Sequence, residues 1–338
     1  MIYLISPKKK QYKANLHSHS TLSDGKKTPE ELKELYRKNG YSILAITDHE
    51  RPRSHTDLNE KDFILLTGYE AHIRPNDTGA FDAFHEEIHI NLFAKDAESE
   101  IYVGYDENYC RAPKESDECR ALIKVGPTEK RALSADYVNA FIAAARENGY
   151  LVSYNHPFWS MQDEADIFEY NGFFSLEIMN YGALLINGLD YAGALYDKML
   201  RRGRRIFCHG GDDNHNKYPL DDPESDSLGA YTVIMPDEFS YDGIIAAMER
   251  GDMYASMGPE LYEVSLDGDK LHIECSDVKD IYVFTGSKMT QRIHAKAGES
   301  LTGADFTIAP EAKYIRVSVH DERGKKADTR GFFPEEFR

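Results

Sequence analysis

Short histidine-containing motifs follow several apolar segments of this 338-residue chain, and they constrain its fold more than any other feature. The motifs are Leu16-His17-Ser18-His19, Thr47-Asp48-His49, Asn155-His156-Pro157 and Gly211-Asp212-Asp213-Asn214-His215, with Glu70 and His89 as two further candidates between them. Imidazole and carboxylate groups are ligands of zinc, manganese and iron, and there are more of them here than one metal site uses. The pattern therefore predicts a cluster of two or three metal ions and metal-assisted hydrolysis.

Apolar segments and helical patterns alternate over the first two thirds of the chain. We expect strands at 13–20, 42–49, 63–73, 87–94, 150–156, 174–180, 205–210 and 230–235. Capping residues and helical spacing predict helices at 28–40, 134–149, 188–203 and 240–251. This alternation indicates an α/β fold with a mostly parallel sheet, covered by helices and closed into a barrel.

The character of the chain changes at about residue 258. Short strands are expected at 262–266, 270–274, 281–285, 306–308 and 314–320, with turn residues and no helix between them. This pattern is typical of a small β-sandwich. We therefore predict two domains, a barrel at 1–257 and a β-sandwich domain at 258–338. Within the barrel, residues 96–131 are rich in charges, proline and glycine, which predicts a surface insertion that acts as a lid.

Composition excludes several classes of protein. A content of 41% hydrophobic and 12% aromatic residues is sufficient for a globular core. A formal net charge of −18 disfavours a broad nucleic-acid interface, but bound cations would still admit a small phosphorylated substrate. Neither a signal-peptide pattern nor an apolar run of membrane-spanning length is present. The four cysteines are widely spaced, so we expect reduced thiols in a cytoplasmic protein, with no membrane partner.

The spacing of the candidate ligands supports a shared metal site. His17 and His19 are two residues apart on a strand, so both rings project from one face and one metal can take both. Asp213 and His215 repeat this spacing. His49 and His156 each end an apolar strand, at the carboxyl rim where barrel enzymes keep their chemistry. Together these positions predict a metal centre at that rim.

In order and context, the motifs His-x-His-Ser…Asp-Gly, Thr-Asp-His, Gly-x-Glu, His-Pro and Asp-x-His resemble those of the PHP (polymerase and histidinol phosphatase) superfamily. The match covers roughly residues 13–257, and the tail resembles the small β domain of some PHP-like phosphoesterases. The resemblance implies a distorted (β/α)7 barrel that holds two or three divalent zinc, manganese or iron ions. It implies three ligand sets: His17, His19, Glu70 and Asp213; Glu70, His89 and His156; and Asp24, His49 and His215. Relatives often have histidine at the position of Asp24.

The chemistry of these side chains suggests two catalytic roles. Glu70 can bridge two cations through its two oxygens, and two metals about 4 Å apart lower the pKa of a water held between them. Asp213 could accept the proton of the nucleophile. Substrate contacts are predicted for six other residues: Arg51, His55, Lys114, Arg120, Trp159 and Asn180. The alternative for the charged residues is that they are simply solvated, and for Trp159 it is packing. His72 and His209 are expected to hold ligands through their ring N–H groups.

The predicted function is metal-dependent hydrolysis of a phosphate ester by a metal-bridging hydroxide. A small-molecule phosphomonoester or a nucleotide is the expected substrate. Two alternatives remain open at this point: a histidinol-phosphatase-like enzyme, and a metal-binding PHP module in which the β domain recognises a partner. Fold-level analogy does not choose the substrate. Nucleic-acid processing is disfavoured by the net charge.

Overall fold

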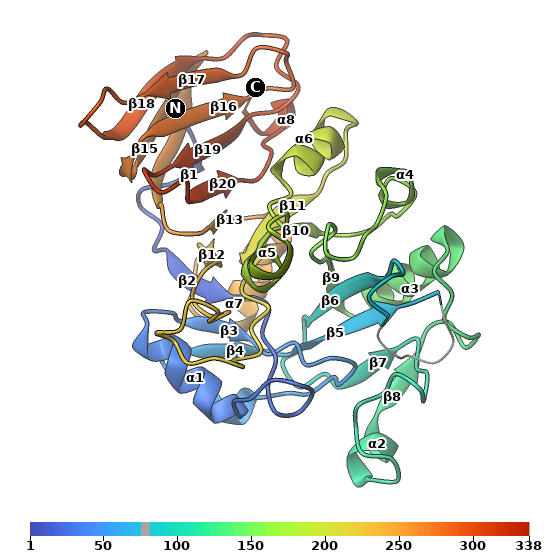
Figure 1. Ribbon diagram of the computed structural model, residues 1–338. Coiled ribbons are helices and arrows are strands. Elements are labelled where there is room, and N and C mark those ends of the chain that lie inside the picture. Colours follow the sequence, from blue (N-terminus) through green and yellow to red (C-terminus); the bar gives the residue numbers. More distant parts are fainter. Residues whose placement is uncertain (76–81, 338) are drawn as a thin grey trace.

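Two sheets of mixed direction carry the histidine motifs, as seen in a computed structural model that describes residues 1–75 and 82–337 (Figure 1). The nine-stranded sheet has the order β17 (Gln291–His294), β16 (Asp280–Phe284), β19 (Arg316–His320), β20 (Lys326–Thr329), β13 (Met253–Ser256), β12 (Tyr231–Ile234), β2 (Tyr12–Asn15), β3 (Ile43–Ala45) and β4 (Ile64–Leu66). The five-stranded sheet has the order β11 (Phe207–Gly211), β10 (Ser175–Asn180), β9 (Tyr150–Tyr154), β6 (Ile88–Ala94) and β5 (Gly68–Ile73).

The prediction of a mostly parallel sheet is wrong for these strands. The pairs β2–β3, β3–β4, β9–β10 and β10–β11 are parallel, whereas β5–β6, β6–β9, β2–β12 and β12–β13 are antiparallel. Antiparallel neighbours need no helical crossover, and the described residues between β5 and β6 contain no helix. The alternation of apolar segments therefore predicted the strands better than it predicted their directions.

The two sheets approach each other at both sides of the site. Thr232 on β12 bridges to β11, because its hydroxyl donates to the carbonyl of Gly210 at 2.8 Å and accepts from the Gly210 N–H at 3.0 Å. On the other side, His49 and Glu70 form an isolated parallel bridge. The described strands do not join into one closed sheet, so what the structure establishes is a mixed α/β fold.

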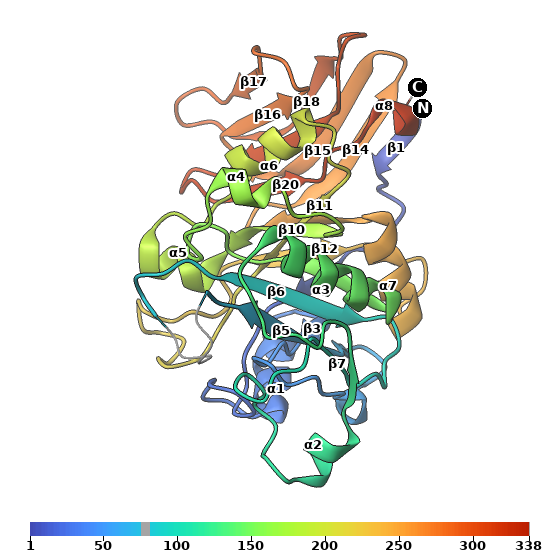
Figure 2. The same ribbon diagram turned by 90° about the vertical axis from the view of Figure 1, so that its right-hand side faces the viewer.

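The helices are α1 (Pro29–Lys38), α2 (Asp117–Ala121), α3 (Ala135–Glu147), α4 (Glu164–Ile167), α5 (Tyr181–Asn187), α6 (Gly193–Arg201), α7 (Tyr241–Arg250) and α8 (Pro334–Phe337), with a 3₁₀ turn at Thr56–Leu58. Helices α3 and α7 pack beside these sheets, whereas α2 lies at the far end of the insertion and α8 lies next to the chain termini (Figure 2). Helix α1 begins with a capping box formed by Thr28 and Glu31. Helix α3 buries Val138, Phe141 and Ile142 in the core of the five-stranded sheet. The expected helices at 28–40, 134–149 and 240–251 are confirmed.

The remaining strands extend the molecule away from the site. A four-stranded sheet has the order β1 (Ile2–Ile5), β14 (Leu261–Asp267), β15 (Lys270–Val278) and β18 (Leu301–Thr307), so the first strand of the chain pairs with the last third. Strands β16, β17, β19 and β20 continue the nine-stranded sheet beyond β13, and the predicted boundary at residue 257 remains a prediction. Both termini lie at this end of the molecule (Figure 2).

The segment predicted as an insertion, 96–131, contains a short parallel ribbon and one helix. The ribbon pairs β7 (Ile101–Val103) with β8 (Ile123–Val125), and α2 lies between them in sequence. Arg131, the last residue of the segment, is buried and donates a hydrogen bond to Glu50, the residue that directly follows His49. Among the helices of the described chain, none combines the length and the hydropathy needed to cross a bilayer.

Candidate metal centre

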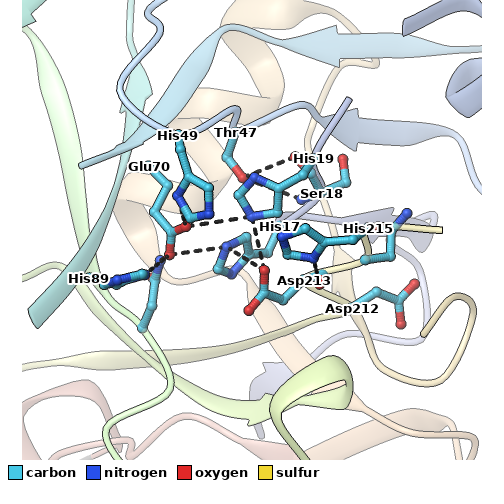
Figure 3. A network of polar contacts seen from close by, with 12 residues as sticks. His17, Ser18, His19, Thr47, His49, Glu70, His89, Asp212, Asp213 and His215 are labelled. Atoms are coloured by element: carbon cyan, nitrogen blue, oxygen red, sulfur yellow. Dashed lines mark hydrogen bonds and ion pairs between the residues drawn. The ribbon is translucent and has the colours of Figure 1, made fainter. Parts of the chain in front are cut away.

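All nine predicted ligands lie at one end of the two sheets, and strand ends bring them together. Figure 3 labels all of them except Asp24 and His156. His17 and His19 follow β2, His49 follows β3, Glu70 lies in β5, His89 lies in β6, His156 follows β9, and Asp213 and His215 follow β11. Backbone hydrogen bonds fix this arrangement. The Asp213 N–H donates to the carbonyl of His17 at 2.9 Å, and the His19 N–H donates to the carbonyl of Asn214 at 3.0 Å. The ends of β2 and β11 therefore present their side chains to the same space.

The first group of potential ligands consists of His17, His19, Glu70 and Asp213. The Nε2 atom of His17 lies 3.2 Å from Glu70 Oε1 and 3.2 Å from Asp213 Oδ1. The Nε2 atom of His19 lies 2.9 Å from Asp213 Oδ1 and 3.5 Å from Glu70 Oε2. This group has the composition of the first ligand set that the resemblance implied.

A second group surrounds the other side of the Glu70 carboxylate. His49, Glu70 and His89 have donor atoms close enough to share one cation. His49 Nδ1 lies 2.9 Å from Glu70 Oε2, and His89 Nδ1 lies 3.2 Å from Glu70 Oε1. His156 Nε2 also approaches Glu70 Oε1, at 3.3 Å. The structure therefore places His49 beside Glu70 in addition to the predicted pair of His89 and His156.

The third group is the most exposed and contains His19, Asp24, His49 and His215. His215 Nε2 lies 3.3 Å from Asp24 Oδ1, and His49 Nε2 lies 3.8 Å from Asp24 Oδ2. The side chain of Asp24 is 47% exposed, compared with 14% for Asp213 and none for Glu70. A cation in this group would therefore meet solvent, whereas cations beside Glu70 would be buried.

Burial and neighbouring charges shift the pKa values of the clustered side chains. Burial opposes the charged form of His17, but the carboxylates of Asp213 and Glu70 outweigh burial and raise its pKa well above the usual value. Burial, together with His49 and His215, lowers the pKa of His19 to about 4. Despite its burial, the surrounding histidines hold the pKa of Glu70 well below the usual value. The carboxylates and the imidazoles of the cluster therefore shift each other's pKa values in opposite directions.

Several polar atoms in the cluster are buried and have no hydrogen-bond partner within residues 1–75 and 82–337. They are Nε2 of His17, Nδ1 of His19, Nδ1 of His49, Oε2 of Glu70 and Nε2 of His89. Buried polar atoms without partners are costly, and in folded proteins they are normally satisfied by another group, by water or by an ion. Among these atoms, His17 Nε2 and His49 Nδ1 face the carboxylate of Glu70, and nitrogen and carboxylate donors that meet without partners fit zinc, manganese or iron. The residues present therefore fit the metal cluster that the sequence predicts.

Three residues that the sequence reasoning did not assign hold these ligands in place. Glu177 on β10 accepts a hydrogen bond from His17 Nδ1 at 2.9 Å. Asn155 donates through Nδ2 to Glu70 Oε1 at 2.8 Å. Asp48 accepts from Ser23 and from both the N–H and the hydroxyl of Ser20, which shapes the turn before Asp24. Glu177 lies between Leu176 and Ile178 in a predicted apolar strand. A glutamate in such a position indicates a buried carboxylate, which requires a partner.

The predicted substrate contacts fall into two groups. Asn180 and Trp159 lie at the cluster, because Asn180 Nδ2 is 3.2 Å from Asp213 Oδ2 and Trp159 packs edge-on against His89 and His156. The other four lie elsewhere or are already engaged. The Nε and Nη2 atoms of Arg51 each donate to one carboxylate oxygen of Glu118 at 2.8 Å. Arg120 pairs with Asp117 on the surface, Lys114 is exposed, and His55 is buried.

The two histidines expected to hold ligands do not make those contacts. Neither ring nitrogen of His72 has a hydrogen-bond partner, although Nδ1 lies 3.3 Å from Glu50 Oε1. His209 lies behind the cluster, where its Nδ1 is 3.1 Å from the hydroxyl of Ser175. The carboxylate of Asp212 accepts the N–H groups of residues 228–230 and supports the backbone beneath the site.

No family model matches this chain, and no curated protein matches it. Solved structures of similar shape include a two-domain protein from Bacteroides vulgatus described as containing a predicted PHP-like metal-dependent phosphoesterase. It has 14% identity and a TM-score of 0.45, over 98% of this chain and 89% of that chain. A protein from Bifidobacterium adolescentis named as a metal-dependent phosphoesterase has 19% identity and a TM-score of 0.40, over 63% and 91%. An amidohydrolase from Chromobacterium violaceum, with bound sulfate and no metal, has 17% identity and a TM-score of 0.37, over 60% and 87%. Likenesses this low do not assign a family or an activity to this chain.

Proposed function

We propose that this protein is a metal-dependent phosphoesterase of the PHP type. The observation that carries the proposal is the overlap of three groups of potential ligands. His19, His49 and Glu70 each belong to two of the groups, so the groups form one continuous centre. A single structural zinc site needs four ligands, and a larger shared set is typical of hydrolytic centres with two or more metals.

The division of labour follows from the geometry of the side chains. Bound divalent cations would supply Lewis acidity and lower the pKa of a coordinated water. Glu70 presents its two oxygens to different histidines, with His17 and His89 near Oε1 and His49 near Oε2, which is the arrangement of a bridging ligand. Asp213 is partly exposed and turns Oδ2 towards Asn180, so it is the carboxylate best placed to take a proton from the nucleophile.

The two linked sheets act as a distorted (β/α)7 barrel, and the centre holds two or three zinc, manganese or iron ions. The substrate is a small phosphomonoester or nucleotide handled in the cytoplasm. The net charge of −18 supports a small substrate over a nucleic-acid polymer, because a broad phosphate-backbone interface requires a basic surface.

The test measures metal content and phosphate release in the same preparations. We expect at least two transition-metal ions per chain and hydrolysis of an aryl phosphate that chelation abolishes and manganese restores. His89→Gln should lower both values, whereas His272→Gln, at a histidine on β15 whose side chain is 43% exposed, should lower neither. Hydrolysis that persists after complete chelation, or a metal content of one ion or none in active protein, would contradict the proposal.

A further inference from the structure

The carboxylate of Glu177 is buried behind the cluster and contacts no solvent. Its Oε1 atom lies 2.9 Å from His17 Nδ1, and both side chains are fully buried. The opposite ring nitrogen, His17 Nε2, faces Glu70 and Asp213 at 3.2 Å. An ionised carboxylate can only accept hydrogen bonds, so His17 Nδ1 must carry the proton in this contact. Nε2 is then the nitrogen left to face the cluster.

The second oxygen of Glu177 supports two more parts of the same site. Oε2 accepts from the backbone N–H of His156 at 3.1 Å and from Asn180 Nδ2 at 2.8 Å. His156 has a φ of 21°, in the left-handed region that non-glycine residues rarely adopt, so its backbone requires such support. Asn180 in turn lies 3.2 Å from Asp213 Oδ2. One carboxylate therefore acts on three of the predicted ligands from behind.

We propose that Glu177 is the positioning residue of the metal centre, which fixes the tautomer of His17 and the orientation of His156 and Asp213. The inference rests on the proposed metal-binding function. A histidine that binds metal usually donates its other ring N–H to a carboxylate or carbonyl, and that partner raises the basicity of the ligating nitrogen. Loss of such a partner weakens metal binding by roughly 10- to 100-fold.

Glutamine cannot replace Glu177, although it has nearly the same shape. The carboxylate accepts three hydrogen bonds, from His17, His156 and Asn180. An amide NH₂ turned towards His17 would force its proton onto Nε2, where it would occupy the nitrogen that faces the cluster. An NH₂ turned the other way would meet two donors. Asn180 cannot turn to compensate, because its Oδ1 caps α5 by accepting from Ala183 N–H at 2.7 Å.

The fit around this pair leaves no room for rearrangement. Gly211 on β11 passes so close that a Cβ atom there would lie 2.8 Å from His17 Cβ and 3.1 Å from Glu177 Oε1. Glycine at this position thus allows β11 to press His17 and Glu177 together. The contact is built into the packing of three strands and is not a chance proximity of two polar groups.

The test compares the affinity for zinc or manganese of Glu177→Gln and Glu177→Asp with that of the wild type, by competition with a chromogenic chelator. We expect at least a 10-fold loss in Glu177→Gln and a partial recovery in Glu177→Asp, which keeps the charge. Asp197→Asn is the matched control, since Asp197 is a buried carboxylate that binds Arg316 and Tyr314 far from the cluster. It should lower stability without changing metal affinity.

A second measurement is made on the wild-type protein and does not require that the Glu177 variants fold. In ¹⁵N-histidine-labelled, zinc-loaded wild type, the His17 ring should show a downfield proton on Nδ1, assigned by its loss in His17→Gln. A proton on Nε2 of His17 would overturn the proposal, and so would a folded Glu177→Gln with wild-type affinity. Wild-type protein that binds no metal would instead overturn the proposed function. The two failures are therefore distinguishable.

Discussion

The buried ion pair between Glu50 and Arg131 connects the insertion to the metal centre, and Arg131→Met tests that connection. Both side chains are at most 1% exposed. Arg131 donates to both carboxylate oxygens of Glu50 and to the carbonyls of His72 and Gly104. Glu50 follows His49 directly, and its N–H donates to the carbonyl of Glu70 at 2.8 Å. Loss of the guanidinium should therefore act on stability and on metal binding together.

The magnitude follows from what remains around Glu50. Without Arg131, the donors to the carboxylate that remain among the described residues are the Tyr102 hydroxyl and the His72 N–H. Removing one partner of a buried pair costs about 3–5 kcal/mol, because the other charge remains buried without compensation. In Glu50→Gln/Arg131→Met no buried charge remains, so the double variant should lose at least about 1 kcal/mol less than the sum of the single variants.

Urea unfolding followed by circular dichroism measures these differences. Arg53→Met is the control, because its side chain is 45% exposed and lies 3.6 Å from Glu100, and surface pairs of this kind contribute roughly 0–1 kcal/mol. We also expect Arg131→Met to hold less metal than the wild type at equal free metal concentration. A loss of stability below about 1 kcal/mol, or additive losses in the double variant, would refute this account of the pair.

Three further predictions concern the site, the insertion and the pH dependence. Glu70→Gln should reduce the hydrolysis rate far more than His72→Gln at equal metal content, and equal losses would remove Glu70 from the bridging role. Replacing residues 107–121 with a short Gly-Ser turn should raise KM for the physiological substrate and leave hydrolysis of an aryl phosphate near wild type; equal loss of both activities in folded, metal-loaded protein would contradict this. Burial lowers the pKa of His209 to about 4 in the folded protein. As the pH falls below the usual histidine pKa, the unfolded chain therefore binds a proton that the folded protein does not. The free energy of unfolding should therefore fall by about 2 kcal/mol between pH 7 and pH 5 because of His209, and urea unfolding of His209→Gln should not show this contribution. If the free energy of unfolding has the same pH dependence in wild type and variant, another group causes the effect.

Local signals in the sequence predicted the helices that have clear caps. Thr28 with Glu31, Ser134 and Ser240 each accept a backbone hydrogen bond at the start of the helix expected there. The helix expected at 188–203 is different, because α5 ends at Gly188 with a φ of 71° and α6 begins only at residue 193. A glycine in the αL conformation ends the preceding helix, so Gly188 marks the end of α5 and not the start of the helix that was expected at 188–203.

Strands stabilised by distant partners could not be predicted. Strand β20 lies in the middle of the nine-stranded sheet although Asp328 and Thr329 are polar. Asp328 is buried there because Arg316 on β19 donates to it, and Arg316 also binds Asp197 on α6. A period-2 pattern of apolar residues is the strand signal in a sequence, and a buried charge pair replaces that pattern with polar letters. Arg316 is 12 residues from Asp328 in the sequence, but its other partner, Asp197, is 119 residues from Arg316.

The metal centre shows the same division between local and distant information. Ligands such as His17 and Asp213 were predictable because their residue types and their spacing of two at strand ends carry the chemistry. Glu177 lies 160 positions from His17, within strand β10, and no metal-ligand motif surrounds it in the sequence. Its role arises only when β2, β10 and β11 meet and the close approach of Gly211 leaves no space for solvent. The metal donors are thus written in short motifs, whereas the tautomer and orientation that make them usable depend on the packing of the strands behind them.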